Sequence, residues 1–369
     1  MTGLYIHVPF CRRKCPYCDF YSVGYREELA EQYADAVIRN LRFYGEEYDT
    51  VYFGGGTPVL LARHIPRILA ACRFKSGAEI TVECNPLGMD GETLKILRGC
   101  GVNRLSVGIQ SASDNELIRL GRTHTFKQAR NAVLTAYKNG FRDISADIML
   151  AVPYQDHASL MSTLKELDDL PLTHISAYLL KIEPNTLFGK NTPKGIPDED
   201  KTADLYLSAV KMLDGIGFHQ YEISNFAKNG FQSRHNLKYW HCEEYLGIGS
   251  AAHSFFRGRR FAVARNLREF ITSEHQSEVI IDENPNLTEE KIMLGLRLTE
   301  GIPQELWERV RNGLPFIPTE YYNIRNGRLS LTPAGFLVSN EIISTLLAHL
   351  IGNTNPRSEY RQYLRQDRA

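Results

Sequence analysis

Three of the seven cysteines in this 369-residue chain lie within eight residues, and their spacing limits what the chain can be. Cys11, Cys15 and Cys18 follow a C-x3-C-x2-C pattern, whereas the other four cysteines are scattered singly. Thiolates this close together converge on a soft centre such as zinc, copper(I) or an iron–sulfur cluster. Structural zinc takes four ligands, and no fourth Cys or His follows at a finger-like spacing. Three cysteines can hold a [4Fe–4S] cluster with one iron open to a ligand from outside the protein; a zinc site, or a disulfide with a spare thiol, is the alternative.

Charge and hydropathy exclude several classes of protein. Lys+Arg and Asp+Glu both total 43, so the net charge is zero, without the basic bias of a nucleic-acid binder. No signal-peptide pattern precedes the first strand-like run at Leu4, and no apolar run approaches the roughly 18 residues of a membrane span. The cysteine spacing is typical of metal binding in a reducing compartment. We therefore expect a cytoplasmic protein that does not bind nucleic acid.

Strand-like and helix-like segments alternate along the first two thirds of the chain. Strands are expected at 4–8, 50–53, 79–83, 104–108, 143–147, 174–179 and 219–223. Helices are expected at 27–44, 63–72, 91–99, 114–120, 126–139, 157–169 and 200–213. This alternation predicts an α/β fold with a parallel sheet and right-handed crossovers, and six or seven units suit a partial (β/α)6-type barrel. In such barrels the chemistry gathers at the C-terminal ends of the strands.

Polar residues and glycines lie at or just past the ends of several of these strand-like runs. Glu83, Gln110 and Asp147 are such residues, and the loop Gly54-Gly55-Gly56-Thr57-Pro58 follows another strand. Each residue alone is compatible with a helix cap or a turn, but together they can form a ring around the mouth into which the cysteine loop projects. The glycines allow the backbone to adopt positive φ and to approach a ligand closely, and successive N–H groups can bind an anion.

The pattern C-x3-C-x-(aromatic)-C, with Tyr17 as the aromatic residue, resembles the signature of the radical S-adenosylmethionine superfamily. The resemblance implies that the open iron is chelated by the amino and carboxylate groups of S-adenosylmethionine. It also implies that one electron cleaves the sulfonium to methionine and a 5′-deoxyadenosyl radical. The loop at Gly54–Pro58 is similar to the superfamily's GGGTP segment, which contacts the methionyl amino group.

The chain from residue 4 to about 255 resembles, more closely, the oxygen-independent coproporphyrinogen III oxidase family. The similar segments are Tyr5–Cys11, Val51–Pro58, Val82–Pro86, Asn103–Ser111, Leu120–His124 and Ala146–Met149. This resemblance implies a polar S-adenosylmethionine site made of Tyr5, Tyr17, Gly55, Gly56, Thr57, Glu83, Gln110, Arg122 and Asp147. An arginine fits such a site because its planar fork suits a carboxylate. The alternatives are a solvated helix end for Arg122 and buried ion pairs with a neighbouring helix for Glu83 and Asp147.

Two departures distinguish the chain from true coproporphyrinogen dehydrogenases and are shared by the HemW branch of haem chaperones. Phe20 stands where those enzymes have a further cysteine, and the chain starts at the first strand, without their N-terminal extension. The branch's HNxxYW motif is matched by His235–Trp240. This match implies haem binding by His235, Asn236, Tyr239 and Trp240, with the His235 imidazole as axial ligand. Tyr and Trp offer flat apolar area with a polar handle; a packed loop is the alternative.

The resemblance leaves three functions open. The favoured one is a haem chaperone that retains the cluster and S-adenosylmethionine and passes haem to acceptor proteins such as respiratory enzymes. Such a protein implies an electron donor such as flavodoxin or ferredoxin, and peripheral membrane association through its acceptors. The second function is decarboxylation of coproporphyrinogen III propionates, and the third is a radical methyltransferase or cyclisation enzyme. Whether the protein is an enzyme is left open.

The change in sequence character near residue 285 predicts three parts. Residues 1–255 are expected to form the radical S-adenosylmethionine core, and residues 256–286 a connecting segment. Residues 287–369 are expected to form a small α+β domain that resembles a winged helix, with helices around a short strand and turn at 327–333.

Overall fold

The computed structural model of the protein describes residues 1–350. The chain forms two compact units, each of which gathers more than one segment. Unit 1 consists of Met1–His219, Asn225–Tyr239 and Glu243–Pro285. Unit 2 consists of Gln220–Ser224, Trp240–Cys242 and, among the described residues, 286–350.

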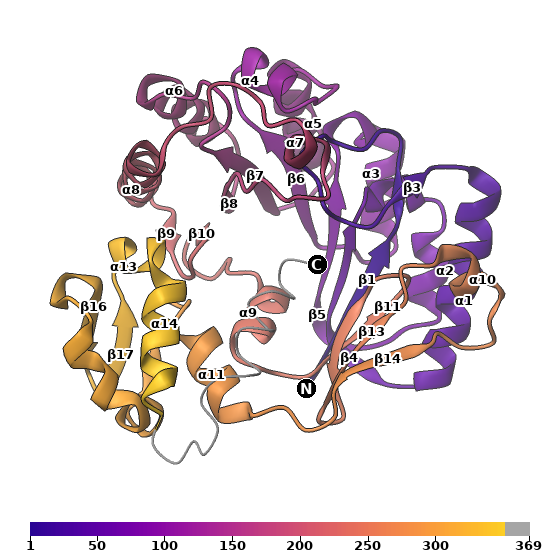
Figure 1. Ribbon diagram of the computed structural model, residues 1–369. Helices are drawn as coiled ribbons and strands as arrows, with labels where there is room; N and C mark the ends of the chain where they lie inside the picture. The colour runs from indigo at the N-terminus through magenta and orange to yellow at the C-terminus, as the bar shows by residue number, and fades with distance from the viewer. Residues whose placement is uncertain (351–369) are drawn as a thin grey trace. The chain divides into compact units, whose positions relative to one another are not determined.

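Unit 1 is built on a parallel sheet whose strands follow one another in chain order (Figure 1). Its six consecutive parallel strands are β1 (Thr2–Val8), β4 (Glu47–Gly55), β5 (Arg73–Cys84), β6 (Arg104–Gln110), β7 (Asp143–Leu150) and β8 (His174–Leu179). Strand β11 (Tyr245–Ile248) pairs in parallel with the other edge of β1. The predicted α/β fold class with a (β/α)6-type parallel sheet is thereby confirmed.

Helices connect these strands, and several begin where the sequence offers a side-chain cap. They are α1 (Glu27–Tyr44), α2 (Ile65–Ala70), α3 (Gly91–Gly99), α4 (Asp114–Arg119), α5 (Phe126–Lys138), α6 (His157–Asp168), α7 (Leu187–Lys190) and α8 (Glu199–Gly215). The side chains of Asp90, Asp156 and Asp198 accept a backbone N–H at the starts of α3, α6 and α8. Helices α1, α3, α6 and α8 lie around the outside of the sheet in Figure 1. No helix within residues 1–350 is long and apolar enough to span a membrane.

The two faces of the parallel sheet have opposite character, because successive side chains of a strand point to opposite faces. One face is apolar and buried, as Leu4 and Ile6 of β1, Val51 and Phe53 of β4, and Leu105 and Val107 of β6 show. The alternate positions are largely polar, and most are also shielded from solvent. They include Tyr5 and His7, Thr50 and Tyr52, Thr81 and Glu83, Arg104 and Ser106, Ser145 and Asp147, and His174 and Ser176. The candidate site is built on this polar face.

Residues 256–286, predicted as a connecting segment, instead complete the sheet of unit 1. They contribute β13 (Arg259–Val263), α10 (Leu267–Thr272) and β14 (Glu278–Asp282). Strand β12 (His253–Phe256) pairs with β11 and β13, and β13 with β14, all antiparallel. The strand predicted at 219–223 is shorter than expected, since β9 covers only His219–Gln220. The chain then returns as β10 (Asn225–Ala227), antiparallel to β8, so the parallel series ends at β8.

Unit 2 is a small α+β unit around a three-stranded antiparallel sheet. The sheet has the order β15 (Ile302–Pro303), β17 (Arg328–Leu331), β16 (Tyr322–Arg325). Asn326 and Gly327 join β16 to β17, and both have the positive φ of a tight hairpin turn. The helices of the unit are α11 (Leu287–Gly295), α12 (Gln304–Trp307), α13 (Pro333–Leu337) and α14 (Ser339–Ala348). The predicted part beyond residue 350 lies outside the described residues.

Candidate functional site

The cysteine loop leaves the end of β1 and is closed at its base by backbone pairing. The short strands β2 (Phe10–Cys11) and β3 (Val23–Gly24) pair in parallel, and the N–H of Val23 donates to the Pro9 carbonyl at 2.7 Å. Within the loop the N–H of Cys18 donates to the Cys15 carbonyl at 3.2 Å. The three cysteines are partly exposed, so their thiols are reachable from solvent while the backbone around them is fixed.

Each thiol of the loop has a polar or thiol neighbour. The hydroxyl of Thr57 lies 3.6 Å from the Cys11 sulfur, and Arg122 donates from Nη1 to the Cys15 sulfur at 3.4 Å. Burial raises the pKa of the Cys18 thiol to about 11, and the nearby thiols of Cys15 and Cys11 add to the rise. The structure therefore brings Thr57 of the glycine loop and Arg122 next to the cysteines, and their role in binding S-adenosylmethionine stays a prediction.

The three thiols of the loop could be ligands of a metal centre. Structural zinc takes four protein ligands, whereas a [4Fe–4S] cluster binds each thiolate on a different iron. Among residues 1–350, no group of three or more His, Cys, Asp or Glu side chains is arranged to hold a single metal ion. Because ligands bind as thiolates, loading a cluster requires Cys18 to lose its proton.

The glycine loop packs tightly against the end of β1, which explains its glycines without reference to a ligand. Gly55 has φ 108°, and a Cβ on it would lie 2.7 Å from the His7 ring. A Cβ on Gly56 would lie 2.6 Å from the Phe10 carbonyl oxygen, and the N–H of Gly56 donates to the Val8 carbonyl at 2.8 Å. Any side chain here would push the loop away from the cysteine segment.

Glu83 and Asp147 are partly buried on the polar face, and each is held by hydrogen bonds. Glu83 accepts from the Tyr52 hydroxyl at 2.9 Å and from the Gly55 N–H at 3.1 Å. The Ser106 hydroxyl lies 2.9 and 3.0 Å from the two carboxylate oxygens of Asp147. Burial raises the pKa of Glu83 to about 7, with the Asp147 charge adding to the rise, and burial also raises the pKa of Asp147. Neither carboxylate forms the ion pair with a helix that was the alternative, within the part of the chain described.

Arg122 lies just past α4 and points one unused donor into the protein. Its Nη2 donates to the Gly108 carbonyl at 3.1 Å, whereas its buried Nε has no hydrogen-bond partner among residues 1–350. Gln110 is close by, because a Cβ on Gly108 would lie 2.9 Å from Gln110 Nε2 and 3.3 Å from Arg122 Nη2. A buried donor without a partner is uncommon in folded proteins. It suits a ligand carboxylate, which an arginine fork binds well.

The two predicted tyrosines have different surroundings. The Tyr17 ring packs against the buried cluster of Leu120, Met149 and Val152. The Tyr5 hydroxyl lies 3.1 Å from Nδ1 of His7, whose ring is adjacent to Gly55. The role of either ring in binding S-adenosylmethionine stays a prediction.

The HNxxYW motif forms a short helix, α9 (Arg234–Trp240), whose first residues dock on the polar face of the sheet. The backbone N–H groups of Arg234 and His235 donate to the Glu79 carboxylate at 2.9 and 3.0 Å. An anionic side chain at this end of a helix satisfies otherwise unpaired N–H groups. Lys238 forms an ion pair with Asp49 at 2.9 Å. The motif is thus packed against the sheet, as in the packed-loop alternative to haem binding, although its backbone is helical.

His235 is completely buried, and both of its ring nitrogens have neighbours. Nδ1 lies 2.8 Å from the Thr50 hydroxyl, and Nε2 lies 2.7 Å from the Tyr239 hydroxyl. Burial lowers the pKa of His235 to about 3, so the ring is neutral at physiological pH, as metal ligation requires. Ligation through Nε2 needs the partly exposed Tyr239 to move. Asn236 is partly exposed, and Trp240 belongs to unit 2; the haem role of all four residues stays a prediction.

Tyr52 was not predicted as a site residue, and His7 was expected only as a structural or cofactor-edge histidine, although both lie among the predicted site residues. Tyr52 contacts Glu83 and stacks on His235, and His7 lies against Gly55. A signal was present, because Thr50, Tyr52 and Gly54 alternate with Val51 and Phe53. That period of two placed Tyr52 on the face opposite the apolar core.

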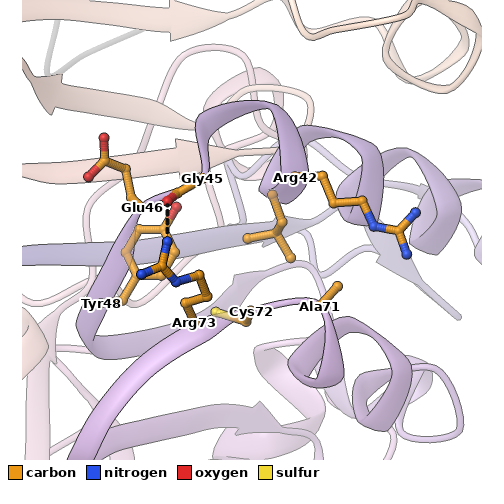
Figure 2. Close-up of a pocket in the computed structure, with 8 residues that line it drawn as sticks. Arg42, Gly45, Glu46, Tyr48, Ala71, Cys72 and Arg73 are labelled. Atoms are coloured by element: carbon orange, nitrogen blue, oxygen red, sulfur yellow. Dashed lines mark hydrogen bonds between the residues drawn. The ribbon is translucent and has the colours of Figure 1, made fainter.

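A small pocket lies away from these residues, at the start of β4 and β5 (Figure 2). Its cavity is about 180 Å³ and is lined by Leu41, Arg42, Gly45, Glu46, Tyr48, Ala71, Cys72 and Arg73. Arg73 turns back to donate to the Gly45 carbonyl at 3.2 Å. None of the predicted site residues lines it, so it has no part in the candidate site.

Comparison of the sequence with known proteins identifies one protein family and a set of related proteins that share one name. Residues 5–167 match the family described as the Radical SAM superfamily. A Lactococcus lactis protein named "Heme chaperone HemW" is 35% identical over 83% of this chain and 84% of its own length. A Haemophilus influenzae protein of the same name is 33% identical over 94% of this chain and 97% of its own length.

Among solved structures, the coproporphyrinogen III oxidase HemN of Escherichia coli has a similar fold. The TM-score is 0.80 over 94% of this chain and 89% of that chain. The sequences are 19% identical, so this likeness concerns the fold alone.

Proposed function

Because the chain belongs to the HemW family of radical S-adenosylmethionine proteins, we propose that it binds haem and transfers it to haem-requiring acceptor proteins. The observation that carries this proposal is the similarity to proteins named haem chaperones over nearly the whole chain, 94% of it in one case. Acceptors such as respiratory enzymes would bring the protein to a membrane only peripherally. An electron donor such as flavodoxin or ferredoxin would reduce the cluster. The protein would act in the cytoplasm.

The cysteine loop and the strand ends would hold the cluster and S-adenosylmethionine that the family implies. Cys11, Cys15 and Cys18 would ligate the cluster, whose chemistry when loaded is one-electron transfer to bound S-adenosylmethionine. Arg122 would bind the ligand carboxylate through its unused Nε. The other residues of the S-adenosylmethionine site would be Tyr5, Tyr17, Gly55, Gly56, Thr57, Glu83, Gln110 and Asp147.

Haem binding would use α9. His235 is neutral and offers Nε2 once the Tyr239 hydroxyl, 2.7 Å away, is displaced. Imidazole is a common axial ligand of haem iron. Thr50 would keep its contact with Nδ1 and so fix the ring, in the way that a second partner orients a ligating histidine. Asn236, the aromatic ring of Tyr239 and Trp240 would complete the haem site.

One residue favours the chaperone over a coproporphyrinogen dehydrogenase. Phe20 occupies the position of the additional cysteine of those enzymes, and its side chain is 59% exposed. A phenylalanine has neither the redox nor the ligand chemistry of a thiol. The propionate decarboxylation implied by the broader family resemblance is therefore not the activity we propose.

The test is an anaerobic haem titration of cluster-reconstituted protein, followed in the Soret band and compared between wild type and His235→Ala. We expect saturable binding in wild type that the variant weakens at least tenfold. His174→Asn is the matched control, because His174 is equally buried on the same face, 2.7 Å from the Ser145 hydroxyl. Transfer is then measured by mixing haem-loaded protein with a haem-free acceptor. A wild type without saturable binding, or with haem that never reaches an acceptor, would contradict the proposal.

A further inference from the structure

Tyr52 is the one side chain, among the described contacts, that touches both the glycine-loop carboxylate Glu83 and the motif histidine His235. It lies on β4, two residues before Gly54, in the strand that leads into the glycine loop. Its side chain is partly buried on the polar face of the sheet. No sequence signature assigns it a role.

The hydroxyl of Tyr52 connects it to the glycine loop. It donates to Glu83 at 2.9 Å, and the same carboxylate accepts the N–H of Gly55 at 3.1 Å. Glu83 is partly buried, and these two donors favour its charged form against the effects of burial and of the Asp147 charge. If the hydroxyl is withdrawn, the carboxylate loses one of the hydrogen bonds that favour its charged form. Its hold on the Gly55 N–H then weakens.

The ring of Tyr52 connects it to α9. It stacks on His235 with 5.1 Å between ring centroids and 24° between planes. The Tyr239 ring also contacts His235, in an edge-to-face arrangement with 5.1 Å between the ring centroids. Moving Tyr239 to free Nε2 changes the packing around the His235 ring, and Tyr52 is in direct contact with that ring.

We propose that Tyr52 is a positioning residue that couples the glycine loop to α9, so that S-adenosylmethionine and haem weaken each other's binding. This inference rests on the proposed function. Haem ligation by His235 would loosen the Tyr52 stack and with it the Tyr52–Glu83–Gly55 contacts that shape the loop. Because coupling is reciprocal, S-adenosylmethionine would lower haem affinity by the same factor. The protein would then hold haem most tightly when the loop is empty.

The experiment measures two affinities, each with and without the other ligand, on cluster-reconstituted full-length chain. The S-adenosylmethionine Kd is measured by calorimetry, and the haem Kd by Soret titration. We expect saturating haem to raise the S-adenosylmethionine Kd about fivefold or more, and S-adenosylmethionine to raise the haem Kd equally. Tyr52→Phe keeps the ring but removes the hydroxyl. It should weaken S-adenosylmethionine binding, leave the haem Kd within twofold, and abolish the coupling.

Tyr48→Phe is the matched control. Tyr48 is buried on the same strand, and its hydroxyl has no hydrogen-bond partner among residues 1–350. Its variant should keep both affinities and the coupling. Wild-type affinities that are independent of each other, or full coupling in Tyr52→Phe, would overturn the inference while leaving haem binding intact. A wild type that binds S-adenosylmethionine but no haem would instead overturn the proposed function, and the coupling with it.

Discussion

Arg122 donates to the sulfur of Cys15 at 3.4 Å, although 107 residues separate the two in the chain. The contact joins the cysteine loop to the segment after α4, and the same guanidinium holds the Gly108 carbonyl at the end region of β6. Among residues 1–350 the Nε of Arg122 has no hydrogen-bond partner, so the side chain contacts a predicted cluster ligand and still has one donor available. Arg122 can therefore contact both parts of the predicted site, the cysteines of the cluster and the S-adenosylmethionine site.

Arg122→Gln should weaken S-adenosylmethionine binding without affecting the cluster. The three cysteines are unchanged, so the reconstituted cluster should retain its absorbance and iron content. The S-adenosylmethionine Kd should rise about tenfold to a hundredfold, since a hydrogen bond to a charged group contributes about 1.5–3 kcal/mol. Arg119→Gln is the control, because Arg119 lies on α4 but bonds the Pro153 carbonyl. Calorimetry that gives the same Kd for wild type and Arg122→Gln would remove Arg122 from the site.

Replacement of Cys11, Cys15 or Cys18 by Ala should abolish the iron–sulfur absorbance after anaerobic reconstitution. A [4Fe–4S] cluster is normally held by four ligands, and three protein thiolates leave no redundancy. Cys100→Ala is the control, because Cys100 is also partly exposed but its thiol donates to the Leu97 carbonyl at 3.2 Å at the end of α3. The measurement is iron and sulfide content per chain. Retention of the full cluster by all three variants would contradict the assignment.

Tyr239→Phe should strengthen haem binding, the opposite of the effect expected for His235→Ala. The Tyr239 hydroxyl competes with iron for Nε2 of His235, from which it lies 2.7 Å. Its net contribution of roughly 0.5–1.5 kcal/mol corresponds to about two- to tenfold in the haem Kd. Soret titrations of both variants measure these opposite changes in the haem Kd. A Tyr239→Phe variant that binds haem more weakly would show that the phenol supports the haem rather than competing with it.

Glu83 should make stability fall as pH rises. Its pKa is about 7 in the folded protein against 4.5 ordinarily, so the folded chain keeps a proton that the unfolded chain releases between those values. The contribution is complete below pH 4.5 and declines by about 3 kcal/mol up to pH 7. Glu83→Gln cannot titrate, so its unfolding free energy relative to wild type should increase across this range.

Urea unfolding of both proteins at several pH values measures that difference. The buried histidines His7, His124 and His235 have lowered pKa values and oppose the trend, because the unfolded chain takes up protons below about pH 6.5. They are present in both proteins, so their effect cancels in the difference. A difference that does not vary with pH would mean that Glu83 titrates normally in the folded state.

The elements of unit 1 were predictable where local pattern and capping agree. The helices at 27–44 and 91–99 have the predicted bounds, and so does the strand at 174–179. Prediction was less accurate where a neighbouring strand decides whether a segment forms a strand. Residues 259–263 and 278–282 are strands because they continue the sheet edge beyond β11 and β12. Residues 221–223 do not continue the sheet of unit 1 because they pair within unit 2, where the N–H of Ile223 donates to the Arg297 carbonyl at 2.9 Å and the N–H of Thr299 donates to the Tyr221 carbonyl at 3.1 Å. In neither case does the local sequence of the segment determine its secondary structure.

The sequence by itself determined the chemistry that this protein offers: three clustered thiols, a glycine loop, and an alternation of strands and helices that makes a parallel sheet. Only the tertiary structure decided which side chains meet. Thr50 and His235 are 185 residues apart yet 2.8 Å from each other, and Tyr52 lies between Glu83 and His235 because of strand register. A shift of one residue would turn Tyr52 to the apolar face. Composition and spacing specify the donors and acceptors, whereas register and helix docking set the distances that allow them to bond.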